Sequence, residues 1–114
     1  MLSRVADSLY WMTRYLERAE NISRYIEVNW HLTLEQPDQK CREWSALIST
    51  TGDARLFQER FDIYNRENVL HFLLFDTSYA HSVISCLRAA RENARTIREF
   101  LSVEICEQVN SFFH

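Results

Sequence analysis

The stretch Tyr15-Leu-Glu-Arg-Ala-Glu-Asn21 lies in the middle of a long segment whose apolar residues recur at spacings of three, four and seven. Residues at these spacings share one face of an α-helix. The apolar positions form one continuous row, which is predicted to face the core: Val5, Leu9, Met12, Leu16, Ala19, Ile26 and Trp30. The segment therefore predicts a long first helix from about Arg4 to Leu34, with Ser3 as its N-cap and Pro37 beyond its end.

The composition favours helices over sheets. The 114 residues include one glycine and one proline, and the tight turns of antiparallel sheets depend on such residues. We therefore predict an all-α fold, an up-and-down helical bundle of four to five helices in a single domain over residues 1–114. One glycine is also too few for a glycine-rich phosphate loop, so the sequence predicts no nucleotide cofactor, and no other cofactor.

The remaining segments read as helices joined by short connections. They are predicted at about 38–50, 54–61, 65–75 and 83–101, with a final helix that Ser102 caps. Gly52 stands where a C-terminal cap belongs, and Asp53 and Asn65 are candidate N-caps. The inner face of the second helix is predicted from Trp44, Leu47 and Ile48. The last long helix has its own apolar row: Val83, Leu87, Ala90, Ala94, Ile97 and Leu101.

Charged residues on the first helix form the first candidate site. Arg14, Glu17 and Asn21 share one face, whereas Arg18 follows Glu17 directly and so points about 100° away. Glu17 and Arg18 therefore cannot clamp one ligand together without help from elsewhere. A solvated face with ordinary i,i+3 and i,i+4 ion pairs explains the same pattern without any ligand.

A second charged stretch, Arg91 to Glu99, lies on the last long helix. Together with Arg88 it forms the arginine row, which is defined by Arg88, Arg91, Arg95 and Arg98. Four like charges along one face repel one another, and the acids Glu92 and Glu99 are expected to project elsewhere. The row is therefore expected to be neutralised by another group. We predict that Glu17 or another acid of the first helix, such as Glu20 or Glu27, pairs with at least one of Arg91, Arg95 and Arg98. The alternative is an anionic ligand that the arginines hold.

The sequence predicts neither a metal site nor a catalytic thiol. Glu27/His31 and Glu67/His71 are each four residues apart, but the Glu-x-x-His spacing of carboxylate-bridged di-iron helices is lacking, so no metal site is predicted. The cysteines are odd in number and widely spaced, which predicts reduced thiols in a cytoplasmic protein and no catalytic cysteine: Cys41, Cys86 and Cys106.

The charge and hydropathy of the chain also bear on partners. A net charge of −3 gives no general attraction to nucleic acid or to an anionic membrane surface. The most apolar run, Val69 to Phe75, is interrupted by His71 and is too short to span a bilayer. The sequence therefore predicts neither a nucleic-acid partner nor a membrane segment.

With both charged stretches in view, the chain resembles the bacterial alpha-E domain family, helical proteins named for a conserved Glu-Arg motif. Three blocks carry the resemblance: 1–12 followed by Arg14-Tyr-Leu-Glu-Arg-Ala-Glu-Asn21, Phe72-Leu-Leu-Phe-Asp76, and Leu87-Arg-Ala-Ala-Arg-Glu-Asn-Ala-Arg95 with Ile97-Arg-Glu99. Cys106 stands where the family is expected to have a tryptophan. The resemblance implies that the chain is the N-terminal part of a longer protein.

The resemblance also implies a setting. Such proteins accompany circularly permuted ATP-grasp proteins and transglutaminase-like proteins, in a system that makes or modifies amide bonds in peptides. The leading hypothesis is a helical partner or scaffold domain without catalytic residues of its own, whose partner is an ATP-grasp-type ligase. The alternative is an enzyme or anion-binding domain that uses Glu17, Arg18, Glu92 and the arginine row. A third hypothesis is self-association as a homodimer.

Overall fold

The structure, a computed structural model, describes residues 2–35 and 40–113. These residues form helices and connecting turns, with no strand among them, which confirms the all-α fold and the long first helix. The elements are α1 (Leu2–Glu35), α2 (Lys40–Thr51), α3 (Ala54–Gln58), α4 (Arg66–Leu70), the π-helical turn η2 (His71–Phe75) and α5 (Val83–Phe113).

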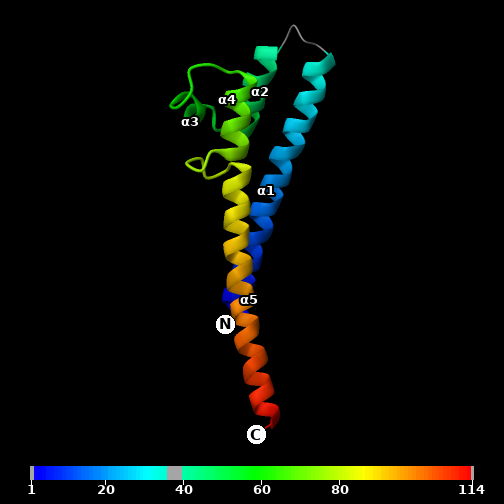
Figure 1. The fold of residues 1–114 in the computed structure, drawn as a ribbon, viewed down its shortest axis with the longest axis vertical. Helices are drawn as coiled ribbons and strands as arrows, with labels where there is room; N and C mark the ends of the chain where they lie inside the picture. The colour runs from blue at the N-terminus through cyan, green and yellow to red at the C-terminus, as the bar shows by residue number, and fades with distance from the viewer. Residues whose placement is uncertain (1, 36–39, 114) are drawn as a thin grey trace.

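The molecule is a rod with a thickened end. Its extents are 73 × 29 × 19 Å and its radius of gyration is 19.8 Å, whereas a compact chain of this length would have a radius of gyration of about 13 Å. Helices α1 and α5 run antiparallel as a helical hairpin, and the shorter helices gather at the end where α1 and α5 diverge (Figure 1). At the opposite end α5 continues alone beyond the start of α1 (Figure 1).

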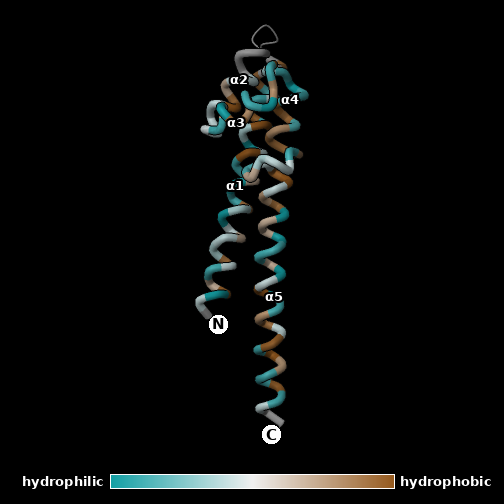
Figure 2. The backbone as a smooth tube through the Cα atoms, turned by 90° about the vertical axis from the view of Figure 1, so that its left-hand side faces the viewer, coloured by the Kyte–Doolittle hydropathy of each residue, from teal (hydrophilic) through white to brown (hydrophobic). Residues whose placement is uncertain are grey.

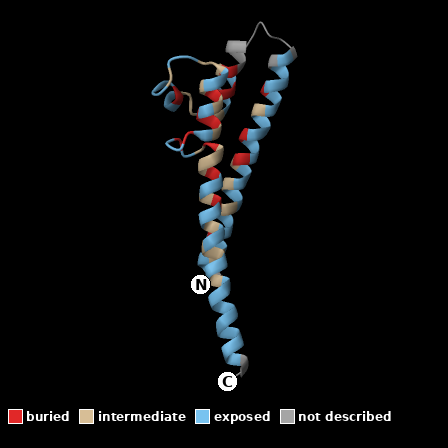
Figure 3. Ribbon diagram, viewed as in Figure 1, coloured by how far each residue is buried: buried red, intermediate tan, exposed pale blue. Residues whose placement is uncertain are grey.

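The hydrophobic core lies at the thickened end. Figure 3 shows the buried residues concentrated there, while residues 101–111 of α5 are all exposed. The inner face predicted for α2 is confirmed, because Trp44, Leu47 and Ile48 are all buried. Phe72 of η2 stacks on Tyr79 with ring centroids 4.1 Å apart and meets Phe57 edge-on at 5.3 Å. Aromatic rings from three short segments thus fill the space between the diverging helices.

Local signals in the sequence fix the connections between the short helices. Gly52 has a φ of 80°, a conformation that glycine adopts without a steric penalty, and its N–H donates to the Ser49 carbonyl at 3.1 Å. The side chain of Asn65 caps α4 by accepting from the Asn68 N–H at 2.8 Å. Both caps were predicted. Ser3, in contrast, lies inside α1 and does not precede it, and Pro37 lies outside the described residues.

The buried stripe of α1 differs from the predicted row. Ala19 is buried and Val5, Met12 and Ile26 are half-buried, but Leu9, Leu16 and Trp30 are exposed. The stripe that faces the rest of the molecule instead includes Ser8, Ile22 and Asn29. The predicted rotation of α1 about its own axis was wrong, because small and polar residues occupy part of its buried stripe. Several larger apolar residues remain on its flanks.

The same difference occurs on α5. Its buried stripe passes through Cys86 and Ala90 and continues through the half-buried Ile97, while the predicted inner residues Leu87, Ala94 and Leu101 are exposed. A second correction concerns the predicted break at Ser102. The helix runs through this position to Phe113 without interruption, and no glycine or proline stands there to end it.

Figure 2 shows apolar and polar residues alternating along the lone end of α5, with no continuous apolar stretch. Within residues 2–35 and 40–113, no helix has the length and apolarity that a membrane crossing requires.

Candidate functional site

Helix α1 spreads the first group of candidate residues over two directions. Arg14, Glu17 and Asn21 are exposed, on the side away from the buried Ala19 and Ile22. Arg18 is half-buried and turns toward α5, where its charge acts on Cys86. The predicted divergence of Glu17 and Arg18 is therefore confirmed. These residues do not meet around one point.

The contact of Arg18 with α5 does not produce a reactive thiol. Burial raises the pKa of the Cys86 thiol, and the positive charge of Arg18 only partly opposes this effect. The thiol is therefore protonated near neutral pH and packs as a small apolar group. Cys106 is free and exposed, and the side chain of Cys41 lies outside the described part of the chain.

Helix α5 presents the arginine row to solvent. All four of its residues are exposed, and Arg95 contacts Glu92 of the same helix, with Nη1 and Oε1 3.2 Å apart. Glu92 was predicted to project away from the arginine row. It instead pairs with Arg95 and neutralises that member of the row. Between the arginine stems lies an open hollow of about 240 Å³, which is lined by Arg91, Ala94, Arg95 and Arg98.

The predicted ion pair between the two long helices is not formed. Among the described residues, no salt bridge within 4.0 Å joins α1 to α5. Glu20 pairs with Arg24 of its own helix at 2.9 Å, and Glu17 forms no salt bridge within the described chain. The reason is geometric. The acids and the arginine row both lie outside the buried stripes, so they do not face each other across the contact between α1 and α5.

A polar network that the sequence analysis missed joins the loops of the thickened end. Tyr79 donates its hydroxyl hydrogen to Asp53 Oδ2, and His81 Nδ1 lies 3.3 Å from the same oxygen. Burial, followed by the hydrogen bond to Asp53, raises the pKa of the Tyr79 hydroxyl. Asp53 stands at the predicted N-cap position of α3, but its side chain makes no capping hydrogen bond. It holds the loop before α5 instead.

A second missed contact is the buried carboxylate of Asp76. It accepts from the Arg60 guanidinium and, at 2.9 Å, from the Ser78 N–H. Its own carbonyl accepts from the Ser82 hydroxyl at 2.8 Å. Burial acts to raise the pKa of this carboxyl, but the hydrogen bonds from Arg60 and Ser78 outweigh it and hold the pKa below its usual value. This carboxylate therefore has a structural role in shaping the turn between η2 and α5.

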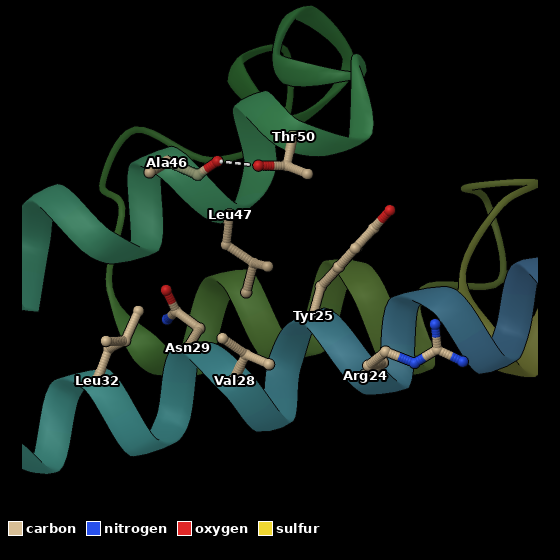
Figure 4. Close-up of a pocket in the computed structure, with 8 residues that line it drawn as sticks. All are labelled: Arg24, Tyr25, Val28, Asn29, Leu32, Ala46, Leu47 and Thr50. Carbon is tan, nitrogen blue, oxygen red and sulfur yellow. Dashed lines mark hydrogen bonds between the residues drawn. The ribbon is translucent and has the colours of Figure 1, made fainter.

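A second hollow, of about 360 Å³, lies between α1 and α2, and we call it the α1–α2 groove. It is lined by Arg24, Tyr25, Val28, Asn29, Leu32, Ala46, Leu47 and Thr50. Figure 4 shows Asn29 between Leu32 and Leu47, on the side of α1 that faces α2. Arg24 points along α1 and away from the other lining residues (Figure 4).

Asn29 is the unusual residue of this groove. The residue is 7% exposed, and its Nδ2 has no hydrogen-bond partner within the part of the chain that the structure describes. A buried amide donor without an acceptor costs about 1–3 kcal/mol. The sequence analysis did not single out Asn29, because a lone asparagine within a helical pattern carries no signal of its own.

Metal-binding side chains are dispersed in this fold. The residues that the structure describes contain no group of three or more histidine, cysteine, aspartate or glutamate side chains placed to hold a metal ion. The i,i+4 pairs Glu27/His31 and Glu67/His71 have no further ligand beside them in that part of the chain.

Comparison with curated proteins and with solved structures finds no match. A family model does match, over residues 1–114, and it is described as Alpha-E, a predicted alpha-helical domain with a conserved ER motif. The match spans both long helices, α1 and α5. The chain therefore belongs to the Alpha-E family.

Proposed function

We propose that this chain is a helical partner domain that binds another protein through the α1–α2 groove. The buried, unsatisfied Nδ2 of Asn29 carries the proposal. A protein segment that seats apolar side chains against Val28 and Leu32 and presents a carbonyl or carboxylate oxygen would satisfy this donor once the Asn29 amide turns from its buried position toward the groove. Binding would then recover the hydrogen bond that the free domain lacks.

The resemblance to alpha-E proteins supplies the proposed partner and setting. The partner is a bacterial, cytoplasmic ATP-grasp-type ligase. The two proteins act beside transglutaminase-like proteins in the ligation or modification of peptides. In this division of labour the ligase supplies the chemistry, and the helical domain supplies a rigid surface that holds the ligase or its peptide.

Replacing Asn29 with leucine tests the groove. The variant removes the unsatisfied donor and adds apolar surface, so the free energy of unfolding is expected to rise by about 1 kcal/mol. Binding to the proposed ATP-grasp-type ligase is expected to weaken at least tenfold. Thermal melts and calorimetric titration with the purified ligase measure the two effects. A gain in stability with a loss of binding is the pattern of a functional site.

Asn21→Leu is the matched control on the exposed face of the same helix. It is expected to leave both the unfolding free energy and the binding constant nearly unchanged. If Asn29→Leu binds the ligase as tightly as wild type, the groove is not the docking site. If wild type itself does not bind the ligase, the proposed partner is wrong.

The second candidate function is an anion site or active site built from the charged residues. It is favoured by the hollow between Arg91, Arg95 and Arg98. Glu17→Ala and Arg95→Ala test it. Both residues are exposed, so each change is expected to alter the free energy of unfolding by less than about 0.5 kcal/mol. On the leading proposal both variants keep ligase binding and product formation. A folded variant that loses either one would favour the charged site.

A further inference from the structure

Four leucines of the helical hairpin are exposed although they lie in helical apolar rows: Leu9 at 50%, Leu16 at 45%, Leu87 at 44% and Leu101 at 49%. Each follows a residue of the buried or half-buried stripe by one position: Ser8, Tyr15, Cys86 and Phe100. The leucines are therefore rotated by about 100° from the stripe in the same sense on both helices.

The four leucines lie on one side of the hairpin. Because α1 and α5 run antiparallel, the same rotation away from their mutual contact leads to the same side of the pair. The cation–π contact of Arg4 with the Phe100 ring, 5.3 Å to the centroid, fixes the axial register. This register sets Leu9 level with Ala94 and Leu16 level with Leu87. We call this surface the leucine face, defined by Leu9, Leu16, Leu87, Ala94 and Leu101.

The two edges of the leucine face carry opposite charges. Arg88 and Arg91 border it on α5, and Glu17 and Glu20 border it on α1. Within the described chain, Arg88, Arg91 and Glu17 form no salt bridge, and the one that Glu20 forms joins it to Arg24. Arg88 and Arg91 therefore lie on one edge of the leucine face without counter-ions. Glu17 and Glu20 lie on the opposite edge, where they do not reach these arginines within the same molecule.

We infer that the leucine faces of two copies of this chain pack together as a four-helix bundle, with the twofold axis parallel to the helices. This axis lays α1 of each copy on α5 of the other, so that Arg88 and Arg91 meet Glu17 and Glu20. A twofold axis across the helices would set arginine against arginine. The arrangement also makes all neighbouring helices antiparallel, as in up-and-down bundles.

The shape of the surface agrees with this packing. The axis keeps each residue at its own height, so Leu9 of the second copy lies over Ala94, at the hollow of about 240 Å³ between the arginine stems. A large side chain over a small one is the knob-and-hole contact of such bundles. The defining residues of the leucine face span about 21 Å along α5, from Leu87 to Leu101, and the two packed helices are about 20 Å wide. That footprint of about 400 Å² is about half of the roughly 800 Å² that each partner buries in a standard interface.

Reciprocal charge reversal tests the arrangement, with molar mass measured by light scattering over a concentration series. Wild type is expected to be a dimer of the 13.7 kDa chain. The variants Arg88→Glu/Arg91→Glu and Glu17→Arg/Glu20→Arg are each expected to dimerise at least tenfold more weakly. An equimolar mixture of the two is expected to recover dimers, because each then supplies the charges that the other lacks.

Arg14→Glu, an exposed reversal on another side of α1, is the control and keeps the dimer, as does Asn29→Leu. Circular dichroism confirms that every variant is helical. A wild type that stays monomeric at all concentrations overturns the inference, as does a mixture that stays monomeric. Because Asn29 lies on a different side of α1, failure of the dimer and failure of ligase binding at the groove are separate results.

Discussion

Phe72→Ala is expected to lower the free energy of unfolding by about 3–5 kcal/mol. The ring is fully buried, stacks on Tyr79 at 4.1 Å and contacts Phe57. Because the core is confined to one end of the rod, few other residues can move into the cavity that the alanine leaves. Proteins of this size are typically stable by about 5–15 kcal/mol, so the change removes a large share of the total. Urea denaturation at fixed protein concentration measures it.

Phe75→Ala is the matched control, since Phe75 belongs to the same π-helical turn but is 62% exposed. Its expected effect is below about 0.5 kcal/mol. The predicted difference between the two variants rests on burial alone. If both lose the same free energy of unfolding, the loss comes from the changed helical propensity of the turn and not from the buried ring.

Asp76→Ala is expected to cost about 2–3 kcal/mol, the range of hydrogen bonds to a charged group. The carboxylate is buried and accepts from Arg60 and from the Ser78 N–H. Its loss leaves the Ser78 amide without this acceptor and the Arg60 guanidinium without its counter-ion. Arg60 is partly exposed and regains water, which keeps the expected loss below that of a fully buried pair. Glu92→Ala, at an exposed ion pair on α5, serves as the control with a small effect.

The same carboxylate makes stability depend on pH. Its pKa is lower in the folded protein than the value of about 3.9 that an unfolded aspartate has. The unfolded state therefore binds the proton more tightly. The stabilisation is fully present above pH of about 5 and is lost as the pH falls through the folded pKa. Asp76→Asn removes this contribution, so its unfolding free energy is expected to fall less than that of wild type between pH 5 and pH 2.

The positions of the long helices along the chain could be predicted from the sequence, but the faces that they bury could not. The scarcity of glycine and proline and the three–four spacing predicted α1 and α2 close to their observed bounds and the start of α5 at Val83, but not the continuation of α5 past Leu101 to Phe113. The buried stripes were misplaced because both long helices carry more apolar residues than one contact can cover. Periodicity alone does not say which of two adjacent rows is used. The small residues Ala19 and Ala90 mark the contact that α1 and α5 use.

The polar contacts at the thickened end could not be predicted from the sequence, for a different reason. Tyr79 and Asp53 are 26 positions apart, and Arg60 and Asp76 are 16 apart. Such pairs are set by how the short helices turn, and nothing in the local pattern fixes this. Asn29 gave no signal either, because its distinguishing property is a missing hydrogen bond in the folded molecule. The charged candidates remain a prediction, and the ion pair predicted between an acid of α1 and the arginines of α5 was wrong among the described residues.

The pairing of α1 with α5 has a consequence for synthesis on the ribosome. The first turn of α1 contacts a residue almost a hundred positions later, as Arg4 does with Phe100. At about 5–20 residues per second, α1 emerges on the order of ten seconds before its partner helix exists. During that interval its apolar rows are open to chaperones. The mutual contact of the two long helices is therefore a late step of folding, and the compact end between them can form first.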